Sequence, residues 1–392
     1  MKVVIATDTY YPNVNGASYF TQRLSLGLIK AGHQVLVIAP SRTQKQGFDN
    51  YENVRVYGVR SVPVFIYKGF RVALPFLAKK ALKEVIAEFG PEVIHLQGHF
   101  FISRSVLKIA KELGIPTIGT NHFMPENLLH YFFIPKFLEE LVKKLAWSQF
   151  RQVFEKLDIV TTPTKSAADY LKKTGFTKGV RPVSCGIDLE RFNPKNNGDY
   201  LAKRYKLPQK PILLSVGRLD KEKNLDVVLK AVQEVSKSID FHFVIAGSGA
   251  YATHLQNLVK KYNIESYATF TGFVSDEDLP NLYCLADCFI IAGTVELQGI
   301  VVMEAMASGL PVIAVEALAL PELVKNGENG YLFRVGDIQA ISESISLIFS
   351  NQSLRQKMAQ KSLAIIQEHD ITRTINQYVR LYEDLTKQKN ES

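Results

Sequence analysis

The sequence predicts an α/β protein made of two doubly wound parallel sheets, and two observations carry this prediction. Short, continuous apolar runs such as Pro211–Val216 recur along the chain, as expected for strands that are buried on both faces of a parallel sheet. Segments with helical periodicity separate these runs, and the alternation of strands and helices favours parallel sheets. The 392 residues suffice for two domains at roughly 150 residues each.

Each half of the chain supplies one series of strands, because its apolar runs are bounded by glycine, proline or polar turn residues. In the first half we expect strands at 2–6, 34–39, 53–58, 92–96, 115–119, 158–162 and 181–184. In the second half we expect them at 211–216, 241–246, 268–271, 287–291, 311–315 and 330–333. Apolar residues at helical spacing predict the main helices at 17–31, 101–113, 136–156, 224–237, 251–262, 337–349, 352–367 and about 372–388.

The polar, turn-rich segment Asn193–Gly198 marks the boundary between the two series. We therefore expect one domain over residues 1–192 and a second over residues 193–371, with the last helix packing back on the first domain. Ligands of doubly wound sheets bind beyond the carboxyl ends of the strands. The loops that follow strands are therefore the candidate sites.

Composition excludes several classes of protein. Hydrophobic residues make up 46% of the chain and charged residues 22%, which excludes a disordered protein. The cysteines Cys185, Cys284 and Cys288 cannot form a disulfide framework, and they favour a reducing compartment. No apolar run approaches the roughly 18 residues of a spanning helix, and no signal-peptide pattern follows Met1. We therefore expect a cytoplasmic protein that is soluble or peripheral.

Positive charge is concentrated in the first half of the chain. Residues 1–192 hold 26 Lys+Arg and 15 Asp+Glu, whereas the remaining residues hold 21 and 23. A one-sided positive charge favours a one-sided anionic partner, which is nucleic acid or a membrane surface.

Two loops after strands carry residues that suit a phosphate. The loop Asp8–Gly16 ends in a glycine before a helix, where backbone N–H groups can approach an anion; an ordinary strand-to-helix turn is the competing interpretation. Arg218 and Lys223 follow a strand of the second half, and two such cations would suit a diphosphate. The alternative is a solvated turn whose charge Asp220 and Glu222 neutralise.

The pattern Gly247-Ser-Gly249-Ala-Tyr-Ala252 matches the dinucleotide-binding fingerprint and keeps an NAD-dependent dehydrogenase as a competing hypothesis. Its context is unfavourable, because the fingerprint belongs on the first strand of a domain and this is the second. The acidic residue expected about 20 positions later would fall near Thr269, and the strand end there carries none.

The most specific segment is Thr294–Gly309, which contains Glu296 before a predicted helix and Glu304 inside it. The helix begins near Gly299, so its free N–H groups can hold a phosphate. Glu304 has apolar neighbours, which indicates a buried helix rather than an exposed one. A buried carboxylate needs hydrogen-bonding partners, and sugar hydroxyls are suitable ones.

This segment resembles the E-x7-E motif of the family 4 glycosyltransferases, with Glu296 and Glu304 at its ends. Further segments resemble that family in order and spacing: Asn15-Gly16, Gly217-Arg218 with Lys223, Gly272-Phe273-Val274, Gly309–Ala314 and Gly186–Phe192. The resemblance covers roughly residues 2–385, nearly the whole chain. It implies the GT-B fold, in which two Rossmann-like domains face each other across a cleft.

The resemblance also implies transfer of a sugar from a nucleotide donor with retention of the anomeric configuration. It implies that Glu304 binds the ribose, that His122 contacts the donor sugar near the reacting carbon, and that Glu296 holds that sugar. The remaining donor contacts that it implies are Arg218, Lys223 and the amides of Gly16, Ile300 and Val301 for the diphosphate, the backbone of Phe273 and Val274 for the base, and the backbone of Gln298 and Gly299 for the sugar.

Fixed cations and helix amides can stabilise a diphosphate leaving group without a metal, so we expect no metal and no cofactor. Asp276-Glu277-Asp278 matches a D-x-D metal pattern, but acids also suit the start of a helix predicted at 276–285. Two departures from the family are Ala317–Leu320, where glycines are usual, and Cys185, where asparagine is usual.

Two basic segments with aromatic flanks predict a membrane-interface surface in the first half. Phe65–Arg71 precedes Lys79, Lys80 and Lys83, and His130–Pro135 precedes Lys136, Lys143 and Lys144. The alternative is that the apolar face of each helix packs on the sheet and the lysines are solvated. Nucleic acid is a poor fit, because no recognised module is present.

Residues 120–127 and 296–299 resemble most those of lipid glycosyltransferases that place glucose on diacylglycerol. Phosphatidylinositol mannosyltransferases are the nearest alternative, and a soluble sugar acceptor stays open. A non-catalytic nucleotide-sugar-binding protein on the same fold is also possible. We therefore predict a peripheral, retaining transferase that moves glucose from UDP-glucose to diacylglycerol at the inner face of the cell membrane; the sequence does not predict its oligomeric state.

Overall fold

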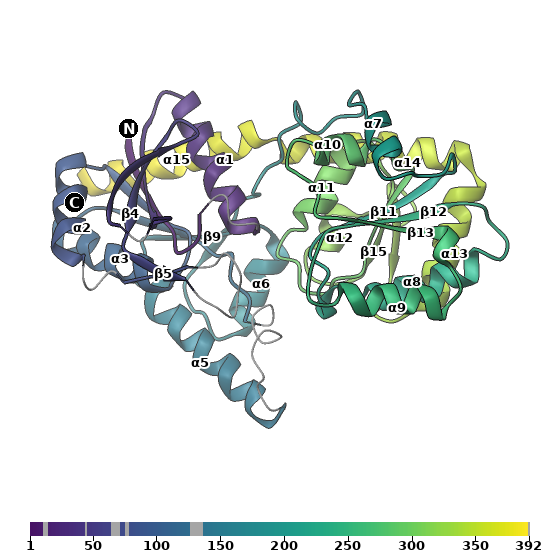
Figure 1. Ribbon diagram of the computed structural model, residues 1–392. Coiled ribbons are helices and arrows are strands. Elements are labelled where there is room, and N and C mark those ends of the chain that lie inside the picture. The colour runs from purple at the N-terminus through teal and green to yellow at the C-terminus, as the bar shows by residue number, and fades with distance from the viewer. Residues whose placement is uncertain (11–14, 44, 64–70, 75–77, 126–135, 391–392) are drawn as a thin grey trace. The chain divides into compact units, whose positions relative to one another are not determined.

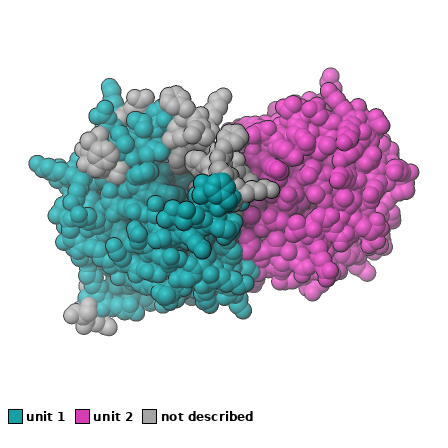
Figure 2. All heavy atoms as spheres, turned by 90° about the horizontal axis from the view of Figure 1, so that it is seen from below, with its two compact units in different colours: residues 1–185, 371–392 teal, residues 186–370 magenta. Residues whose placement is uncertain are grey.

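The chain folds into two compact units in a computed structural model, which describes residues 1–392 except 11–14, 44, 64–70, 75–77, 126–135 and 391–392. Unit 1 comprises residues 1–185 and 371–392, and unit 2 comprises residues 186–370 (Figure 2). The boundary predicted after residue 192 lies inside unit 2, because Ile187 and Phe192 are fully buried in the core of that unit.

Unit 1 contains an eight-stranded sheet in the order β10-β9-β8-β7-β1-β2-β4-β3. Its strands are β1 (Lys2–Ala6), β2 (Gln34–Pro40), β3 (Gly47–Tyr51), β4 (Val54–Val59), β7 (Val93–Leu96), β8 (Thr117–Thr120), β9 (Ile159–Thr162) and β10 (Val180–Pro182). All pairings in this sheet are parallel except that of β3 with β4. The buried apolar runs of the central strands explain why their positions are predictable from the sequence.

Three strands of unit 1 are absent from the sequence prediction. The edge strand β3 is largely exposed and has no continuous apolar run. It turns into β4 through Glu52 and Asn53, whose φ values are 47° and 66°. Positive φ at both central residues defines a type I′ hairpin turn. The other two strands, β5 (Ser61–Pro63) and β6 (Arg71–Ala73), pair antiparallel in a short ribbon.

Helices cover both faces of the unit 1 sheet, and the last helix of the chain is one of them. These helices are α1 (Gly16–Lys30), α2 (Lys79–Phe89), α3 (Phe101–Leu113), α5 (Lys136–Phe154), α6 (Lys165–Lys173) and α15 (Ile371–Asn390). In Figure 1, α15 lies beside α1. A Cβ at Gly27 of α1 would lie 2.5 Å from Ile375 Cδ1, so this glycine permits the close packing. Tyr378 and Tyr382 of α15 are fully buried in the core of unit 1.

Unit 2 contains a six-stranded parallel sheet in the order β13-β12-β11-β14-β15-β16. Its strands are β11 (Ile212–Val216), β12 (His242–Ala246), β13 (Ala268–Gly272), β14 (Cys288–Ile291), β15 (Val312–Val315) and β16 (Gly330–Phe333). Its helices are α7 (Asp199–Arg204), α8 (Leu225–Val235), α9 (Ala252–Lys261), α10 (Leu279–Tyr283), α11 (Ile300–Ala307), α12 (Leu320–Leu323), α13 (Ile338–Ser350) and α14 (Gln352–Ile366). The predicted class of two doubly wound parallel sheets is therefore confirmed, with an antiparallel edge strand added in unit 1.

Candidate functional site

Two loops meet at the carboxyl edge of the unit 2 sheet, because β11 and β14 are adjacent strands. The loop after β11 contains the 3-10 turn Lys221–Lys223 and leads into α8, and the loop after β14 leads into α11. Carboxyl edges of doubly wound sheets are where ligands bind. The sequence-predicted residues on these loops are Arg218, Lys223, Glu296, Gln298 and Gly299.

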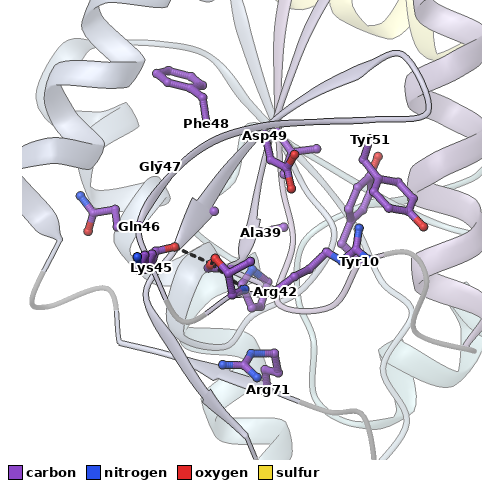
Figure 3. Close-up of a pocket in the computed structure, with 15 residues that line it drawn as sticks. Tyr10, Ala39, Arg42, Lys45, Gln46, Gly47, Phe48, Asp49, Tyr51 and Arg71 are labelled. Carbon is purple, nitrogen blue, oxygen red and sulfur yellow. Dashed lines mark hydrogen bonds between the residues drawn. The ribbon is translucent and has the colours of Figure 1, made fainter.

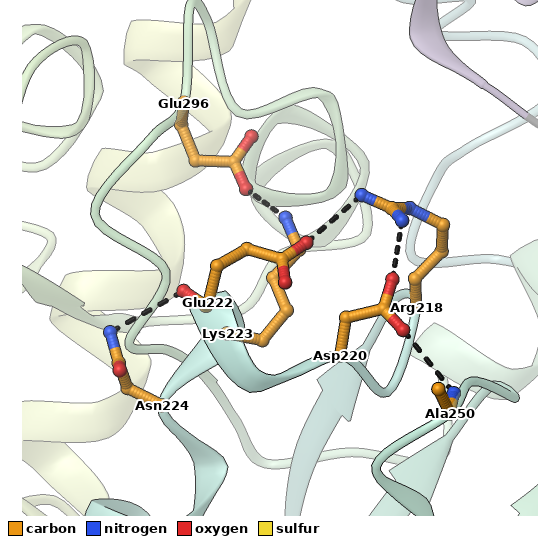
Figure 4. Close-up of polar contacts among 7 residues, drawn as sticks. All are labelled: Arg218, Asp220, Glu222, Lys223, Asn224, Ala250 and Glu296. Carbon is orange, nitrogen blue, oxygen red and sulfur yellow. Dashed lines mark hydrogen bonds and ion pairs between the residues drawn. The ribbon is translucent and has the colours of Figure 1, made fainter. Parts of the chain in front are cut away.

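Lys223 and Glu296 connect the two loops directly. The Lys223 ammonium donates to Glu296 Oε1 at 2.7 Å, and both side chains are largely buried. Asn224 Nδ2 donates to the Ala292 carbonyl at 3.0 Å. A Cβ at Gly293 would lie 3.2 Å from Lys223 Cδ, so this glycine leaves room for the lysine. The loops therefore hold a cation and a carboxylate together at the sheet edge (Figure 4).

Arg218 is held within the first loop. Its guanidinium forms an ion pair with Asp220 and a second one with Glu222, the latter at 3.0 Å. Asp220 also accepts the Ala250 N–H at 3.3 Å. The alternative interpretation of this loop expected these two carboxylates to neutralise the charge. The two ion pairs are those that this interpretation expected.

Glu304 lies on α11 with 5% of its surface exposed. Its Oε2 accepts a hydrogen bond of 3.0 Å from the hydroxyl of Tyr283, which is fully buried on α10. This partner was not predicted from the sequence, because nothing around Tyr283 distinguishes it from an ordinary core tyrosine. The carboxylate is therefore positioned from within the protein.

The start of α11 supplies backbone donors. Gly299 precedes the helix with a φ of +77°, a conformation that favours glycine. Its carbonyl accepts the N–H groups of Val302 and Met303 at 2.9 and 3.2 Å. The N–H groups of Ile300 and Val301 belong to the first turn, whose donors have no partner within a helix. An anion at this end is favoured by those donors and by the helix dipole.

Two further predicted residues follow β13. Gly272 has a φ of +71° and ends that strand, Phe273 is 60% exposed, and Val274 is buried. The side chain of Gln298, on the loop after β14, is also buried. The backbone around Phe273 is thus at the surface of the sheet edge, as contact with a ligand requires.

The glycines of the dinucleotide-like pattern have a packing role. A Cβ at Gly247 would lie 1.8 Å from the Gly217 carbonyl oxygen, and one at Gly249 would lie 2.3 Å from that of Leu219. Leu219 N–H also donates to the Ser248 carbonyl at 2.9 Å. Close approach of the Arg218 loop therefore explains both glycines without a dinucleotide.

His122 and Gly16 belong to unit 1. Gly16 begins α1, and Asn15 caps that helix by accepting the Ser18 N–H at 2.9 Å. His122 lies beyond β8, and its Nε2 donates to Gln97 Oε1 at 2.9 Å. Burial lowers the pKa of His122 to about 4, so the ring is neutral near pH 7 with Nδ1 as an acceptor. Gln97 is a positioning residue that the sequence analysis missed.

Two family models match this chain. The model described as Glycosyltransferase Family 4 matches residues 14–191, and the model described as Glycosyl transferases group 1 matches residues 199–363. The chain is 31% identical over 340 residues to the alpha-monoglucosyldiacylglycerol synthase of Streptococcus pneumoniae, covering 85% of this chain and 75% of that protein. The chain belongs to the family 4 glycosyltransferases.

Another relative agrees with this membership, and a solved structure agrees with the fold. The GDP-mannose-dependent alpha-mannosyltransferase of Mycobacterium tuberculosis is 29% identical over 342 residues, which cover 86% of this chain and 85% of that protein. The crystal structure of Anabaena HepE in complex with UDP-glucose superimposes with a TM-score of 0.78 at 17% identity, covering 98% of this chain and all of that one. The predicted family, GT-B fold class and enzyme class are therefore confirmed: this protein is a glycosyltransferase.

One of the D-x-D-like acids of this glycosyltransferase, Asp278, has local partners. Helix α10 begins at Leu279, later than the predicted start at 276. The Asp278 carboxylate accepts hydrogen bonds from Tyr200 and, at 2.6 Å, from Arg204, and these bonds lower the pKa of Asp278. In the part of the chain that is described, no group of three or more His, Cys, Asp and Glu side chains is arranged to hold a metal ion. Metal independence stays a prediction.

The transferase departs from its family at two positions that the structure describes. Leu318 has a φ of +44°, where the family usually has glycine. The next residue, Ala319, donates its N–H to the Glu296 carbonyl at 3.4 Å, so this loop supports Glu296 without glycines. Cys185 is buried in the core of unit 1, and burial raises the pKa of its thiol to about 12.

The lysines predicted to contact a membrane lie on α2 and α5, and most have acidic partners. Lys79 and Lys83 pair with Glu112 at 3.6 and 2.8 Å, and Lys80 pairs with Glu84 at 3.9 Å. On α5, Lys143 pairs with Glu140 at 2.7 Å, and Lys144 is exposed. The side chain of Lys136 and the aromatic segments 65–70 and 130–135 lie outside the described residues.

Helix α5 changes character along its length. Phe137, Leu141 and Leu145 recur every four residues and are 81%, 54% and 55% exposed, whereas Trp147 and Phe150 are buried in the core of unit 1. The first part of the helix therefore presents an apolar stripe, and the later part packs as the alternative interpretation expected. Among the helices that the described residues form, none has both the length and the apolar character needed to cross a membrane.

Proposed function

We propose that this glycosyltransferase moves glucose from UDP-glucose to diacylglycerol, at the inner face of the cell membrane and without a metal or other cofactor. The observation that carries the sugar and the acceptor is the 31% identity to a synthase named for alpha-monoglucosyldiacylglycerol. UDP-glucose itself has an α linkage, so an α-linked product corresponds to retention of configuration. The UDP-glucose complex of HepE, which shares the fold, supports the choice of donor.

In this proposal the carboxyl edge of unit 2 binds the donor. Arg218 and Lys223 face the diphosphate together with the first N–H groups of α11. Their ion pairs with Asp220, Glu222 and Glu296 hold both side chains in place before the donor arrives, which lowers the ordering cost of binding. The Glu304 carboxylate accepts the ribose hydroxyls, while the backbone at Phe273 and Val274 meets the base.

In the transfer step, the bond between the anomeric carbon and the diphosphate oxygen breaks. The acceptor oxygen bonds to that carbon, UDP leaves with the electron pair of the broken bond, and the proton of the acceptor hydroxyl is released to water. Negative charge then accumulates on the diphosphate, where fixed cations and helix amides, including that of Gly16, stabilise the transition state. Glu296 holds the sugar with the backbone of Gln298 and Gly299. Neutral His122, with Gln97 on its Nε2, offers Nδ1 to a sugar hydroxyl.

An anionic membrane surface fits the exposed part of unit 1. The apolar stripe Phe137–Leu145 lies on a helix that also carries the exposed Lys144, and the half of the chain that contains it is basic. Apolar side chains beside cations suit a helix that lies in the interface of anionic lipid. Such a location gives access to diacylglycerol, which is confined to the bilayer.

A second candidate is mannosyl transfer from GDP-mannose to a different acceptor, such as phosphatidylinositol or a soluble sugar. The 29% identity to a GDP-mannose-dependent mannosyltransferase over 86% of the chain favours it. The two candidates share the diphosphate and ribose contacts and differ at the base, the sugar and the acceptor.

The test is transfer of radiolabelled glucose from UDP-glucose into vesicles of diacylglycerol and anionic lipid with EDTA present, followed by counting the organic phase. Label in the lipid phase, lost in the Glu304→Ala variant, supports the proposal. Parallel reactions with GDP-mannose, and with phosphatidylinositol in place of diacylglycerol, test the second candidate. If the protein still binds UDP but no label reaches the lipid phase, the proposed transfer of glucose to diacylglycerol is refuted.

A further inference from the structure

A pocket of about 340 Å³ lies in unit 1 beyond the carboxyl end of β2. Its lining comes from Tyr10 after β1, the end of β2, the connection to β3, β3 itself, β4 and one residue of β6 (Figure 3). The lining includes none of the residues assigned above to the donor, and Arg71 is its one residue from a segment predicted to meet a membrane. Parallel sheets bind ligands at this edge, so the pocket is a candidate site of its own.

The pocket has an excess of positive charge. Arg42, Lys45 and Arg71 line it, against a single carboxylate, Asp49. The described residues supply no salt bridge within 4.0 Å to any of these three cations. This differs from the basic helices of unit 1, where the lysines of α2 pair with glutamates.

Two of the cations are held in place by neutral groups. The Arg42 guanidinium lies over the Tyr51 ring at 4.5 Å from its centroid, a favourable cation–π contact. Arg71 donates from Nε to Ser61 Oγ at 2.8 Å and from a terminal nitrogen to the Ser61 carbonyl at 2.9 Å. These contacts fix the side chains without neutralising them, which is the arrangement that favours binding of an anion.

We propose that this pocket binds a phosphate ester. Arginine guanidinium groups match the oxygens of a phosphate, and Ser41, Thr43 and Gln46 of the lining offer hydrogen bonds to the hydroxyls of an esterified polyol. Ligand pockets range from about 300 to 1,000 Å³, so this pocket suits a glycerol phosphate or a lipid headgroup rather than a whole nucleotide sugar. The inference goes beyond the proposed function, since it requires neither a particular donor nor a particular acceptor.

The test compares the full chain with the double variant Arg42→Gln/Lys45→Gln. The matched control is Lys30→Gln/Lys173→Gln, which removes two exposed cations of unit 1 outside the pocket. The probes are sn-glycerol 3-phosphate, titrated by calorimetry, and phosphatidylcholine vesicles with and without phosphatidylglycerol, assayed by sedimentation. Thermal melting verifies folding, and a titration with UDP verifies that unit 2 is intact.

If the affinity for glycerol 3-phosphate falls about tenfold in the double variant but not in the control, the result supports the site and a soluble phosphate ester as its ligand. Binding to phosphatidylglycerol vesicles alone, with the same difference between the variants, supports a lipid headgroup. Equal binding by the double variant and the control, or no binding of either probe by the native chain, overturns the proposal. UDP affinity should stay constant throughout, so failure of this site is distinguishable from failure of the donor assignment.

Discussion

Lys223 and Glu296, which are 73 residues apart in the chain, form an ion pair of 2.7 Å between two loops. The pairing follows from the sheet order, because the strands before these loops are adjacent. It joins a cation proposed for the diphosphate to a carboxylate proposed for the sugar. A change in either residue should therefore disturb the other.

Replacing Glu296 with Gln tests this coupling. The variant keeps the size of the side chain but removes the charge that positions Lys223, so stabilisation of the leaving diphosphate should weaken. We expect kcat to fall roughly 10²-fold, the range seen when one preorganised electrostatic group is lost, with a smaller change in the Kd of UDP. Steady-state kinetics and a UDP titration measure both. Glu316→Gln, an exposed glutamate, is the control, and an unchanged kcat in Glu296→Gln would contradict the assignment.

The Tyr283→Phe variant tests how Glu304 is held. Removing the hydroxyl takes one hydrogen bond from a buried carboxylate, which should cost about 1–3 kcal/mol of unfolding free energy and weaken UDP binding. Urea denaturation and calorimetry measure these effects. Tyr262→Phe, at a half-buried tyrosine of unit 2, should change neither quantity. Native UDP affinity in Tyr283→Phe would show that the hydroxyl does not position the carboxylate.

Much of the fold is predictable because the central strands are continuous apolar runs whose ends are set by turn residues. Strand β3 cannot be predicted in this way. It lies at a sheet edge and is largely exposed, so it has no continuous apolar run. Its turn uses Glu52 and Asn53 with positive φ instead of the Asn-Gly pair that usually signals a hairpin. Unit 2 begins at Gly186, earlier than the boundary that the sequence predicts after residue 192. The burial of Ile187 and Phe192 in unit 2 depends on contacts that sequence periodicity does not reveal.

The candidate site likewise contains residues that the sequence predicts and partners that it does not. Glu296 and Glu304 are found because they lie at a fixed spacing around one helix start. Their partners Lys223 and Tyr283 come from other elements, and only the sheet order brings them together. Gln97 is likewise remote in sequence from His122, so no local pattern identifies it.

The Gln97→Glu variant tests the environment of His122. Burial lowers the pKa of His122 to about 4, so the native ring should stay neutral above roughly pH 5. A carboxylate in place of the Gln97 amide favours the imidazolium and should raise this pKa by about one unit or more. NMR titration of the ring nitrogens measures the shift, and activity at about pH 5 should fall in the variant if the neutral ring is required. Gln149→Glu, at an exposed position of α5, is the control, and an unmoved His122 titration in Gln97→Glu would exclude direct contact.

The triple variant Phe137→Ser/Leu141→Ser/Leu145→Ser tests the apolar stripe of α5. These side chains are more than half exposed, so their loss should change the free energy of unfolding little. Full burial of one such side chain is worth about 1.5–3 kcal/mol, and partial insertion of three should make vesicle affinity fall roughly 10²-fold. Sedimentation with anionic vesicles measures the affinity. Leu347→Ser, at an exposed leucine of unit 2, should bind as the native chain does. Native vesicle binding by the triple variant would mean that another surface meets the membrane.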